Sequence, residues 1–209
     1  MLWPWAGQEL GRLLAACPRH AVPTGTARVA GDFPETAFMV VEKGIVVITS
    51  SAPAKRRIIL GFGSEGSLLP KPCSDEQLVA LQHAVLVAVS LDVQQRLLRL
   101  PAAAEAIVDA LLEVVQERQQ SLAQFGTAMH AERLRGKLLQ LARAHGSVVA
   151  DGVRLELPLT HELLAQTLGS ARETVTCSLR TLEQEGFLVR EEGGYRLAIS
   201  PALLDPDSP

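Results

Sequence analysis

The stretch GSARETVTCSLR, residues 169–180, brings together side chains whose chemistry suits contacts with nucleic acid. An arginine such as Arg172 can donate two parallel hydrogen bonds to O6 and N7 of guanine, and a carboxylate such as Glu173 can accept one from the N4 amino group of cytosine. Each such contact contributes about 1–3 kcal/mol of discrimination between bases. Cys177 lies farther along the same stretch, and its thiol is a weak donor that behaves as a small hydrophobic group.

Two of these side chains have a competing interpretation. Ser170-Ala-Arg-Glu173 fits the S-x-x-E pattern of a capping box, in which Glu173 bonds the backbone at the start of a helix instead of a base. Cys177 is either a neutral packing or contact residue, or a thiol near Arg180 whose oxidation adds negative charge and opposes a phosphate backbone. The sequence leaves both alternatives open.

Two short helices must position these side chains. Thr160 is a good N-cap for HELLAQTL, Gly169 ends that helix, and Ser170 is expected to cap a second helix that Gly186 closes. Two helices joined by a short turn containing Gly predict a helix-turn-helix, whose second helix can enter the major groove. The spacing predicts burial between the helices for Leu163, Leu164, Leu168, Val175, Leu179 and Leu182. It leaves on the outer face Arg172, Glu173, Thr176, Cys177 and Arg180.

The flanking segments extend this unit. RLELPL, residues 154–159, predicts a short strand, and FLVREEGGYRLAI, residues 187–199, predicts a hairpin of the kind called a wing. The preceding segment AERLRGKLLQLARAHG predicts a helix rich in Arg and Lys that Gly146 ends. Residues 130–200 hold nine Lys or Arg and nine Asp or Glu, so DNA affinity is expected to rest on few phosphate contacts with a shallow salt dependence.

Residues 101–129 predict one long helix. Proline suits the first turn of a helix, so this helix is expected to begin at Pro101, after a short helix that Ser90 caps. The apolar positions repeat every three and four residues, which is the pattern of two helices packed along their length. The alternative is an amphipathic helix packed on its own domain. The predicted dimerisation seam consists of Val108, Leu111, Val115, Arg118, Leu122, Phe125 and Met129.

Residues 1 to about 90 alternate in the manner of strands. AFMVVEKGIVVITSS predicts two strands around a turn at Glu42-Lys43-Gly44, and RRIILGFGSEGSLL predicts a strand that runs into a Gly-rich bend. QLVALQHAVLVAVS predicts two more strands with a break near Gln82-His83. The predicted fold class is α+β: a β-roll over residues 1–100, a helix over 101–129, a winged helix-turn-helix over 130–200 and a flexible tail over 201–209.

Composition narrows the function classes. Cys17, Cys73 and Cys177 are far apart and lack metal-ligand spacing, so a reduced cytosolic chain without a metal is expected. No pairing of a nucleophile with a base stands out, which disfavours an enzyme. The first residues do not resemble a signal peptide, and the longest apolar run, AVLVAV, is too short to cross a bilayer. The expected protein is soluble and cytoplasmic, with no membrane partner.

The segment LPLTHELLAQTLGSARETVTCSLRTLEQEGFLV resembles the DNA-binding domain of the bacterial cyclic-AMP receptor protein and fumarate-nitrate-reductase regulator (CRP/FNR) family. The resemblance extends back through AERLRGKLLQLA, residues 131–142, and PAAAEAIVDALLEVVQERQQ, residues 101–120. It implies a β-roll that senses a signal, a helix that pairs two subunits and a winged helix that binds a palindromic promoter site, with RNA polymerase as a further partner. It implies base contacts by Arg172 and Glu173, whereas Thr160, Ser170, Thr176 and Arg180 would touch phosphates. In nucleotide-responsive members an arginine stands in the place of Cys177, so the resemblance predicts altered specificity there.

The chain departs from that family in its sensor segment. Family members that bind cyclic nucleotides carry an arginine in a phosphate cassette, but no arginine occurs from Ile58 through Gln95. A buried cyclic phosphate needs a fixed charged donor, so control by cyclic AMP is not expected. Three scattered cysteines do not make an iron–sulfur site, and a lone His83 is weak evidence for haem. We therefore expect a regulator that has no cofactor and needs no effector; the alternatives are a redox-responsive regulator through Cys177 and a protein-interaction module that has lost DNA reading.

Overall fold

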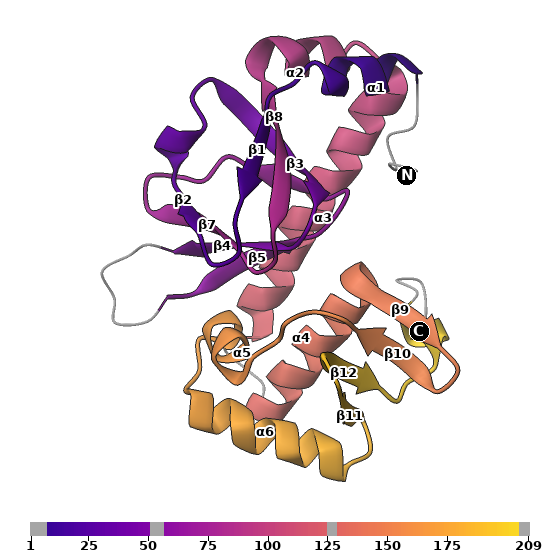
Figure 1. Cartoon of the computed structure of the whole chain (residues 1–209). Helices are drawn as coiled ribbons and strands as arrows, with labels where there is room; N and C mark the ends of the chain where they lie inside the picture. Colours follow the sequence, from indigo (N-terminus) through magenta and orange to yellow (C-terminus); the bar gives the residue numbers. More distant parts are fainter. Residues whose placement is uncertain (1–7, 51–56, 125–128, 205–209) are drawn as a thin grey trace. The chain divides into compact units, whose positions relative to one another are not determined.

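The computed structural model describes residues 8–50, 57–124 and 129–204 and forms two compact units, Met1–Arg118 and Gln119–Pro209 (Figure 1). The helices of the first unit are α1 (Gln8–Ala15), α2 (Leu91–Leu97) and most of α3 (Pro101–Gln124), with a short 3₁₀ turn η1 (Ala30–Asp32). Its strands are β1 (Arg19–Val22), β2 (Ala27–Arg28), β3 (Thr36–Lys43), β4 (Val46–Ser50), β5 (Ile59–Gly63), β6 (Leu68–Pro70), β7 (Glu76–Ala80) and β8 (Ala84–Ser90).

The strands of the first unit form two antiparallel sheets, with the orders β1-β8-β3-β6 and β2-β7-β4-β5. Strands that follow each other in the sequence therefore separate: β3 and β4 lie in different sheets, as do β7 and β8. The predicted turn at Glu42-Lys43-Gly44 thus passes the chain from one sheet to the other. Gly44 makes this possible, because it has a φ of 86° and an added Cβ there would overlap the carbonyl oxygen of His83.

Strand β3 is buried on both faces, which explains its nearly continuous apolar sequence. Successive side chains point to opposite faces of a strand. Met39 and Val41 accordingly pack against the second sheet in a core that includes Phe33 and Leu78, whereas Phe38 packs toward the helices. The helical side of this sheet is covered by residues of α1, α2 and the first turns of α3, namely Leu13, Leu14, Cys17, Leu97, Ala103 and Ile107.

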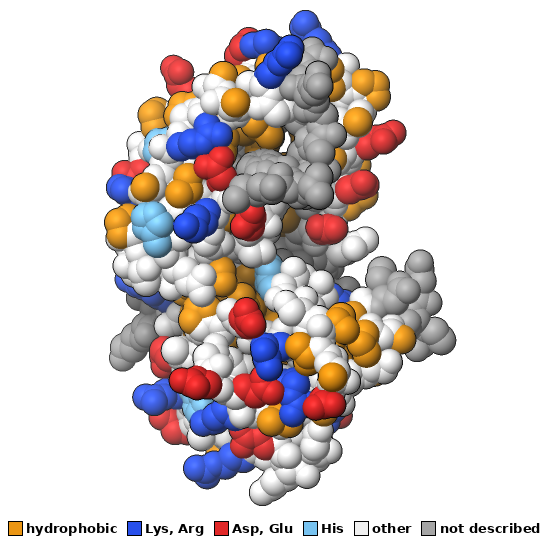
Figure 2. Space-filling model, turned by 45° about the vertical axis from the view of Figure 1, so that its right-hand side comes forward, with side chains coloured by type: hydrophobic (Ala, Val, Ile, Leu, Met, Phe, Trp, Pro, Cys, Tyr) orange, Lys and Arg blue, Asp and Glu red, His pale blue; other side chains and the backbone are white. Residues whose placement is uncertain are grey.

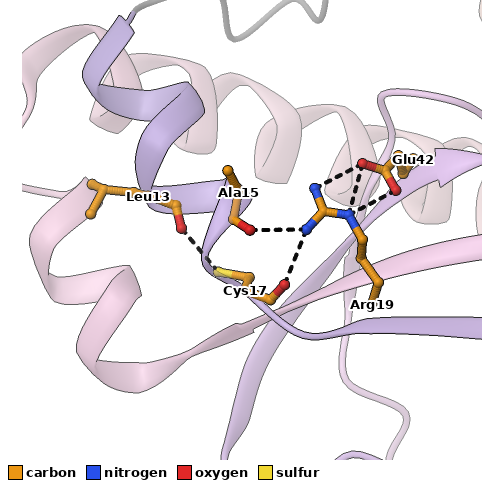
Figure 3. Close-up of polar contacts among 5 residues, drawn as sticks. All are labelled: Leu13, Ala15, Cys17, Arg19 and Glu42. Atoms are coloured by element: carbon orange, nitrogen blue, oxygen red, sulfur yellow. Dashed lines mark hydrogen bonds and ion pairs between the residues drawn. The ribbon is translucent and has the colours of Figure 1, made fainter.

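Helix α1 was not predicted from the sequence. Arg19 fixes its C-terminal end, because the guanidinium donates to the carbonyl oxygens of Ala15 and Cys17, both at 3.2 Å, and pairs with Glu42 at 3.0 Å (Figure 3). The Cys17 thiol donates to the carbonyl oxygen of Leu13 at 3.4 Å. Burial raises the pKa of this thiol, which keeps it protonated and places Cys17 among the packing residues of the core.

The transition to helices follows the predicted capping. The Ser90 hydroxyl accepts a hydrogen bond from the backbone N–H of Val93 at the start of α2, and α3 begins at Pro101 as expected. Helix α3 is described as far as Gln124, and residues 125–128 lie outside the described residues. Met129, predicted to lie in this helix, is the N-cap of the next one, where its extended backbone, with φ −61° and ψ 154°, cannot continue a helix.

The second unit contains α4 (His130–His145), α5 (His161–Leu168) and α6 (Arg172–Gln184), with a 3₁₀ turn η2 (Pro201–Leu204) at the start of the predicted tail. Its sheet has the order β11-β12-β10-β9 and comprises β9 (Gly146–Val149), β10 (Gly152–Leu155), β11 (Leu188–Glu191) and β12 (Gly194–Leu197). Strand β9 was not predicted. Strands β11 and β12 form the predicted wing hairpin, with Gly193 at a φ of 84° in its turn. Among the described helices, none has a stretch long and apolar enough to cross a membrane.

Candidate nucleic-acid interface

Helices α5 and α6 form the predicted helix-turn-helix. The Thr160 hydroxyl accepts from the backbone N–H of Leu163 at 3.1 Å, and Gly169 ends α5 in the left-handed conformation with a φ of 58°. The predicted apolar contacts are all buried: Leu163, Leu164, Leu168, Val175, Leu179 and Leu182. Helix α4 also packs on α6 through its buried Leu134, Leu138, Leu141 and Ala142, so α6 is held from two sides with one face exposed.

The start of α6 differs from the prediction. Its N-cap is Ala171, and no side chain caps it. Ser170 is only 8% exposed, and its hydroxyl donates to the carbonyl oxygen of Leu168 at 3.4 Å and contacts Nδ1 of His130 at 3.3 Å. The predicted capping box is therefore wrong, because tertiary contacts turn this hydroxyl inward. The phosphate contact by Ser170 stays a prediction. Glu173 is left exposed at the first turn of α6.

The exposed face of α6 carries the predicted set of residues. Arg172, Glu173, Cys177 and Arg180 are exposed, and Thr176 is half-buried. Among the described residues, the side chains of Arg172, Glu173 and Arg180 have no hydrogen-bond or ion-pair partner. These charged groups are solvated and ready to contact a ligand, and the first turn of α6 presents a donor and an acceptor side by side.

Most other cations of the second unit are engaged within the protein. On α4, Arg133 donates to the carbonyl oxygen of Leu168, Arg135 pairs with Glu185 and lies 4.3 Å from the ring centre of Phe187, and Arg143 donates to the carbonyl oxygen of Leu203 at 3.2 Å. Lys137 is buried with Nζ 2.8 Å from Oε1 of Gln140. The basic residues of α4 are thus engaged in contacts within the protein, and two of them, Arg133 and Arg135, join α4 to the helix-turn-helix. Over the second unit in Figure 2, blue and red side chains are accordingly interspersed.

The wing neutralises much of its own acidity. Glu191 pairs with Arg154 at 2.9 Å and with Arg196 at 2.7 Å. The hydrogen bond from Arg196, followed by the contacts with Arg154, lowers the pKa of Glu191, so this carboxylate stays ionised and paired. The pairing of Glu191 makes the wing less acidic than its Glu191-Glu192 sequence suggests, which reduces repulsion of a nearby phosphate backbone.

A contact that sequence reasoning missed joins the wing to the helix-turn-helix. His161, the first residue of α5, has Nδ1 2.9 Å from the Thr176 hydroxyl and Nε2 3.3 Å from Nη2 of Arg190 on β11. Burial, then the cations Arg190 and Arg172, lower the pKa of His161. A histidine after an N-cap threonine was visible in the sequence, but its partners lie 15 and 29 residues away.

The predicted dimerisation residues divide into three groups. Val108, Leu111 and Val115 lie on α3 with 52%, 45% and 48% of their surfaces exposed, and Leu112, which was not predicted, is 52% exposed. Arg118 and Leu122 also lie on α3, but their side chains are outside the described set, as is the whole of Phe125. Met129 is 80% exposed at the start of α4. The middle of α3 thus presents an apolar face that no other described residue of this chain covers.

Two residues considered as possible haem or metal ligands lie in the first unit, outside the helix-turn-helix. His83 is exposed in the bend between β7 and β8, and Cys73 is exposed before β7. No group of three or more His, Cys, Asp or Glu side chains within the described ranges is arranged to hold a metal ion.

A two-sheet β unit followed by a long helix and a winged helix-turn-helix defines the class of DNA-binding proteins with a β-rich N-terminal domain. Residues 132–204 match the Crp-like helix-turn-helix domain. Over 167 residues, 76% of this chain and 75% of the relative, the sequence is 27% identical to a global nitrogen regulator from Synechococcus elongatus. Residues 132–204 therefore form a helix-turn-helix domain of the Crp-like type, and the chain as a whole is similar to CRP/FNR-type transcription regulators.

Solved structures agree on the fold. A CooA variant from Carboxydothermus hydrogenoformans superposes with a TM-score of 0.79 at 20% identity, over 95% of this chain and 90% of that chain. A CRP-family transcriptional regulator from Thermus thermophilus superposes with a TM-score of 0.66 at 20% identity, over 88% of this chain and 94% of that chain. The predicted fold class and family resemblance are confirmed.

Proposed function

We propose that the protein is a homodimer that reads an inverted-repeat DNA site through the exposed face of α6. The observation that carries this proposal is the pair Arg172 and Glu173, exposed and unpartnered among the described residues on a recognition helix whose other faces are buried. Arg172 reads a guanine, Glu173 accepts from a cytosine, and Arg180 contacts a phosphate. Two such helices in a symmetric dimer read half-sites one helical turn apart. The protein acts in the cytoplasm with RNA polymerase as a further partner.

Selection of bound duplexes from a random oligonucleotide pool tests the DNA-reading role. We expect enrichment of an inverted repeat. A pool that shows no enrichment at low salt refutes the proposal and favours the alternative of a protein-interaction module.

Arg172→Ala and Arg180→Ala form a matched pair, since each removes one exposed arginine from the same helix. Arg172→Ala is expected to weaken binding to the selected site about 5- to 150-fold more than binding to random DNA, the equivalent of one bidentate base contact. Arg180→Ala is expected to weaken both about equally. Equal losses for Arg172→Ala mean that this residue holds only phosphate.

The uncovered apolar face of α3 supports the homodimer. Val108, Leu111 and Val115 follow the spacing of a two-helix seam and are each about half exposed. Leu111→Asp with Val115→Asp is expected to give monomers in sedimentation, because charges in a seam are poorly solvated. Glu113→Lys, on the opposite side of the helix by heptad position, is the control and should remain dimeric. A variant with both Asp substitutions that remains dimeric places the interface elsewhere.

We further propose that DNA binding needs no small-molecule effector. The space between the two sheets of the first unit is filled by an apolar core in which Phe33, Met39, Leu78 and Leu86 are fully buried. No arginine between Ile58 and Gln95 offers a charged donor to a cyclic phosphate. Protein purified without additives should bind its selected site fully, and cyclic AMP should leave the affinity unchanged. Binding that appears only when a small molecule is added contradicts this part of the proposal.

Redox control through Cys177 is a second candidate, because the thiol is exposed on the same face as Arg172 and Arg180. Oxidation would place negative charge where the proposed interface meets phosphate. A Cys177→Ser variant, which removes the oxidisable sulfur and nearly keeps the size of the side chain, tests this candidate.

A further inference from the structure

Three elements of the DNA-binding unit meet at His161. The residue begins α5, its Nδ1 contacts Thr176 on α6, and its Nε2 contacts Arg190 on β11 of the wing. On its far side, Arg190 also pairs with Glu183 of α6, with Nε and Oε1 3.5 Å apart. The side chains form a chain from the wing to the first turn of α6, since the Thr176 hydroxyl reaches the carbonyl oxygen of Arg172 at 2.9 Å.

The hydrogens in this chain can be assigned from one fact: a guanidinium only donates. Nε2 of His161 must therefore accept from Arg190 and carry no proton. The neutral ring then carries its proton on Nδ1, which donates to the Thr176 hydroxyl. The hydroxyl's own hydrogen is left to donate to the carbonyl oxygen of Arg172, as its 2.9 Å distance indicates. Every donor has an acceptor, but only while His161 is neutral.

The charges around His161 make the neutral ring the stable form. Arg190, Arg172 and Arg180 act to lower the pKa of His161 in addition to the larger effect of burial, and among the described residues Glu183 is the one facing group that raises it. A proton on Nε2 would point at the guanidinium of Arg190. That arrangement replaces a hydrogen bond by two facing donors and two like charges.

Glu183 offers Arg190 another arrangement. Its Oε1 atom is buried and accepts no hydrogen bond among the described residues, because the ion pair with Arg190 is too long for one. An arginine released by His161 can therefore turn toward this oxygen or toward solvent, and 57% of its side-chain surface is already exposed.

We propose that His161 is a proton-dependent positioning residue that holds Arg190 away from the DNA backbone while it is neutral and releases it when protonated. Protonation of His161 and release of Arg190 then add one or two cations per subunit to the exposed face of α6. On this face Arg172 and Arg180 have no partner among the described residues. Acidification then adds phosphate contacts that carry no sequence information, so DNA is held more tightly and less selectively. This inference rests on the proposed DNA-binding role.

The first arm of the test uses no DNA. Nitrogen-15 NMR of the imidazole rings in the full-length protein should show His161 as the Nδ1–H tautomer at about pH 8, with protonation only below about pH 6.5, the ordinary histidine value. An Nε2–H tautomer, or protonation above that pH, overturns the hydrogen assignment. This arm stands even if the protein binds no DNA, so its failure is distinct from failure of the proposed function.

The second arm measures the salt dependence of binding to random-sequence duplex at about pH 8 and about pH 5.5. For the parent, the slope of log K against log salt should steepen by about 0.9 to 1.8 per subunit on acidification, for one or two added phosphate contacts. His161→Gln should not steepen. His130→Gln, which changes a second histidine in contact with the helix-turn-helix through Ser170, is the control and should steepen like the parent. Equal steepening in His161→Gln and the parent overturns the proposal.

Discussion

The salt dependence of DNA binding can be derived from which arginines are already engaged. In the second unit the cations of α4 and of the wing are held by carboxylates, carbonyls or a histidine, and among the described residues Arg172 and Arg180 remain without partners on α6. Of these two, Arg172 is proposed to read a guanine and Arg180 to contact a phosphate, so a dimer makes two phosphate contacts through free arginines. Since each neutralised phosphate contributes about −0.9 to the slope of log K against log salt, the parent should show a slope of about −1.8.

This slope predicts that raising the salt from about 50 to about 200 mM weakens binding about 12-fold. Arg180→Ala removes both phosphate contacts of the dimer, so its slope should fall to about zero and the same change of salt should leave its binding nearly unchanged. Fluorescence anisotropy with a labelled duplex of the selected site, at about pH 8 where His161 is neutral, measures both slopes.

Arg143→Ala is the matched control, because Arg143 is exposed on α4 but donates to the carbonyl oxygen of Leu203. Its slope should equal that of the parent. An unchanged slope in Arg180→Ala refutes the reasoning. A parent slope near about −7 also refutes it, since that value needs about eight phosphate contacts and therefore cations that the structure places in internal pairs.

Three further predictions concern single residues. Gly44→Ala should destabilise the protein by more than about 1 kcal/mol in urea unfolding, since its φ is positive and the added Cβ meets the carbonyl oxygen of His83, whereas Gly61→Ala, with open space around it, should have a much smaller effect. Because the pKa of His161 is lowered in the folded protein, the unfolded chain binds a proton at a higher pH than the folded one does, so the stability that neutral His161 contributes is complete above about pH 6.5 and is lost as the pH falls below it. Unfolding measured at several pH values should therefore show a smaller loss of stability on acidification for His161→Gln than for the parent. An equal loss contradicts the assignment of a neutral His161. Under redox control, mild peroxide should weaken DNA binding of the parent but not of Cys177→Ser, and equal responses exclude this thiol as the sensor.

Local signals in the sequence predicted those parts of the fold that local physics controls. Thr160, Gly169 and Ser90 act within a turn or two of chain, and the structure has each cap in the predicted place. Pro101 starts α3 for the same reason, because its fixed φ and missing N–H suit a first turn. The two strands predicted over QLVALQHAVLVAVS, with a break near Gln82-His83, are also present as β7 and β8.

Local sequence signals gave the wrong prediction where residues distant in the sequence bind the same polar or charged side chain. Ser170 has the sequence of an N-cap, yet its hydroxyl is buried against Leu168 and His130. The arginines of α4 look like a DNA-binding surface, yet their partners, such as Glu185, follow some fifty residues later, as the pair with Arg135 shows. Helix α1 was not predicted although Leu13, Leu14 and Cys17 follow helical spacing. Its apolar face is short, and burial against the sheet that it covers, rather than a local signal, stabilises it.

The sequence by itself determined the order of the elements, the helix-turn-helix and the set of side chains on the outer face of its second helix, because spacing and capping are properties of a short stretch of chain. Only the tertiary structure decided which of those groups remain free. Arg172, Glu173 and Arg180 are free because no neighbouring element supplies them with a partner among the described residues, whereas Arg190 and His161 hold each other across 29 residues. Packing likewise decided the accessibility of the cysteines. Cys177 is exposed on the open face of α6, whereas Cys17 is buried in the core that α1 covers.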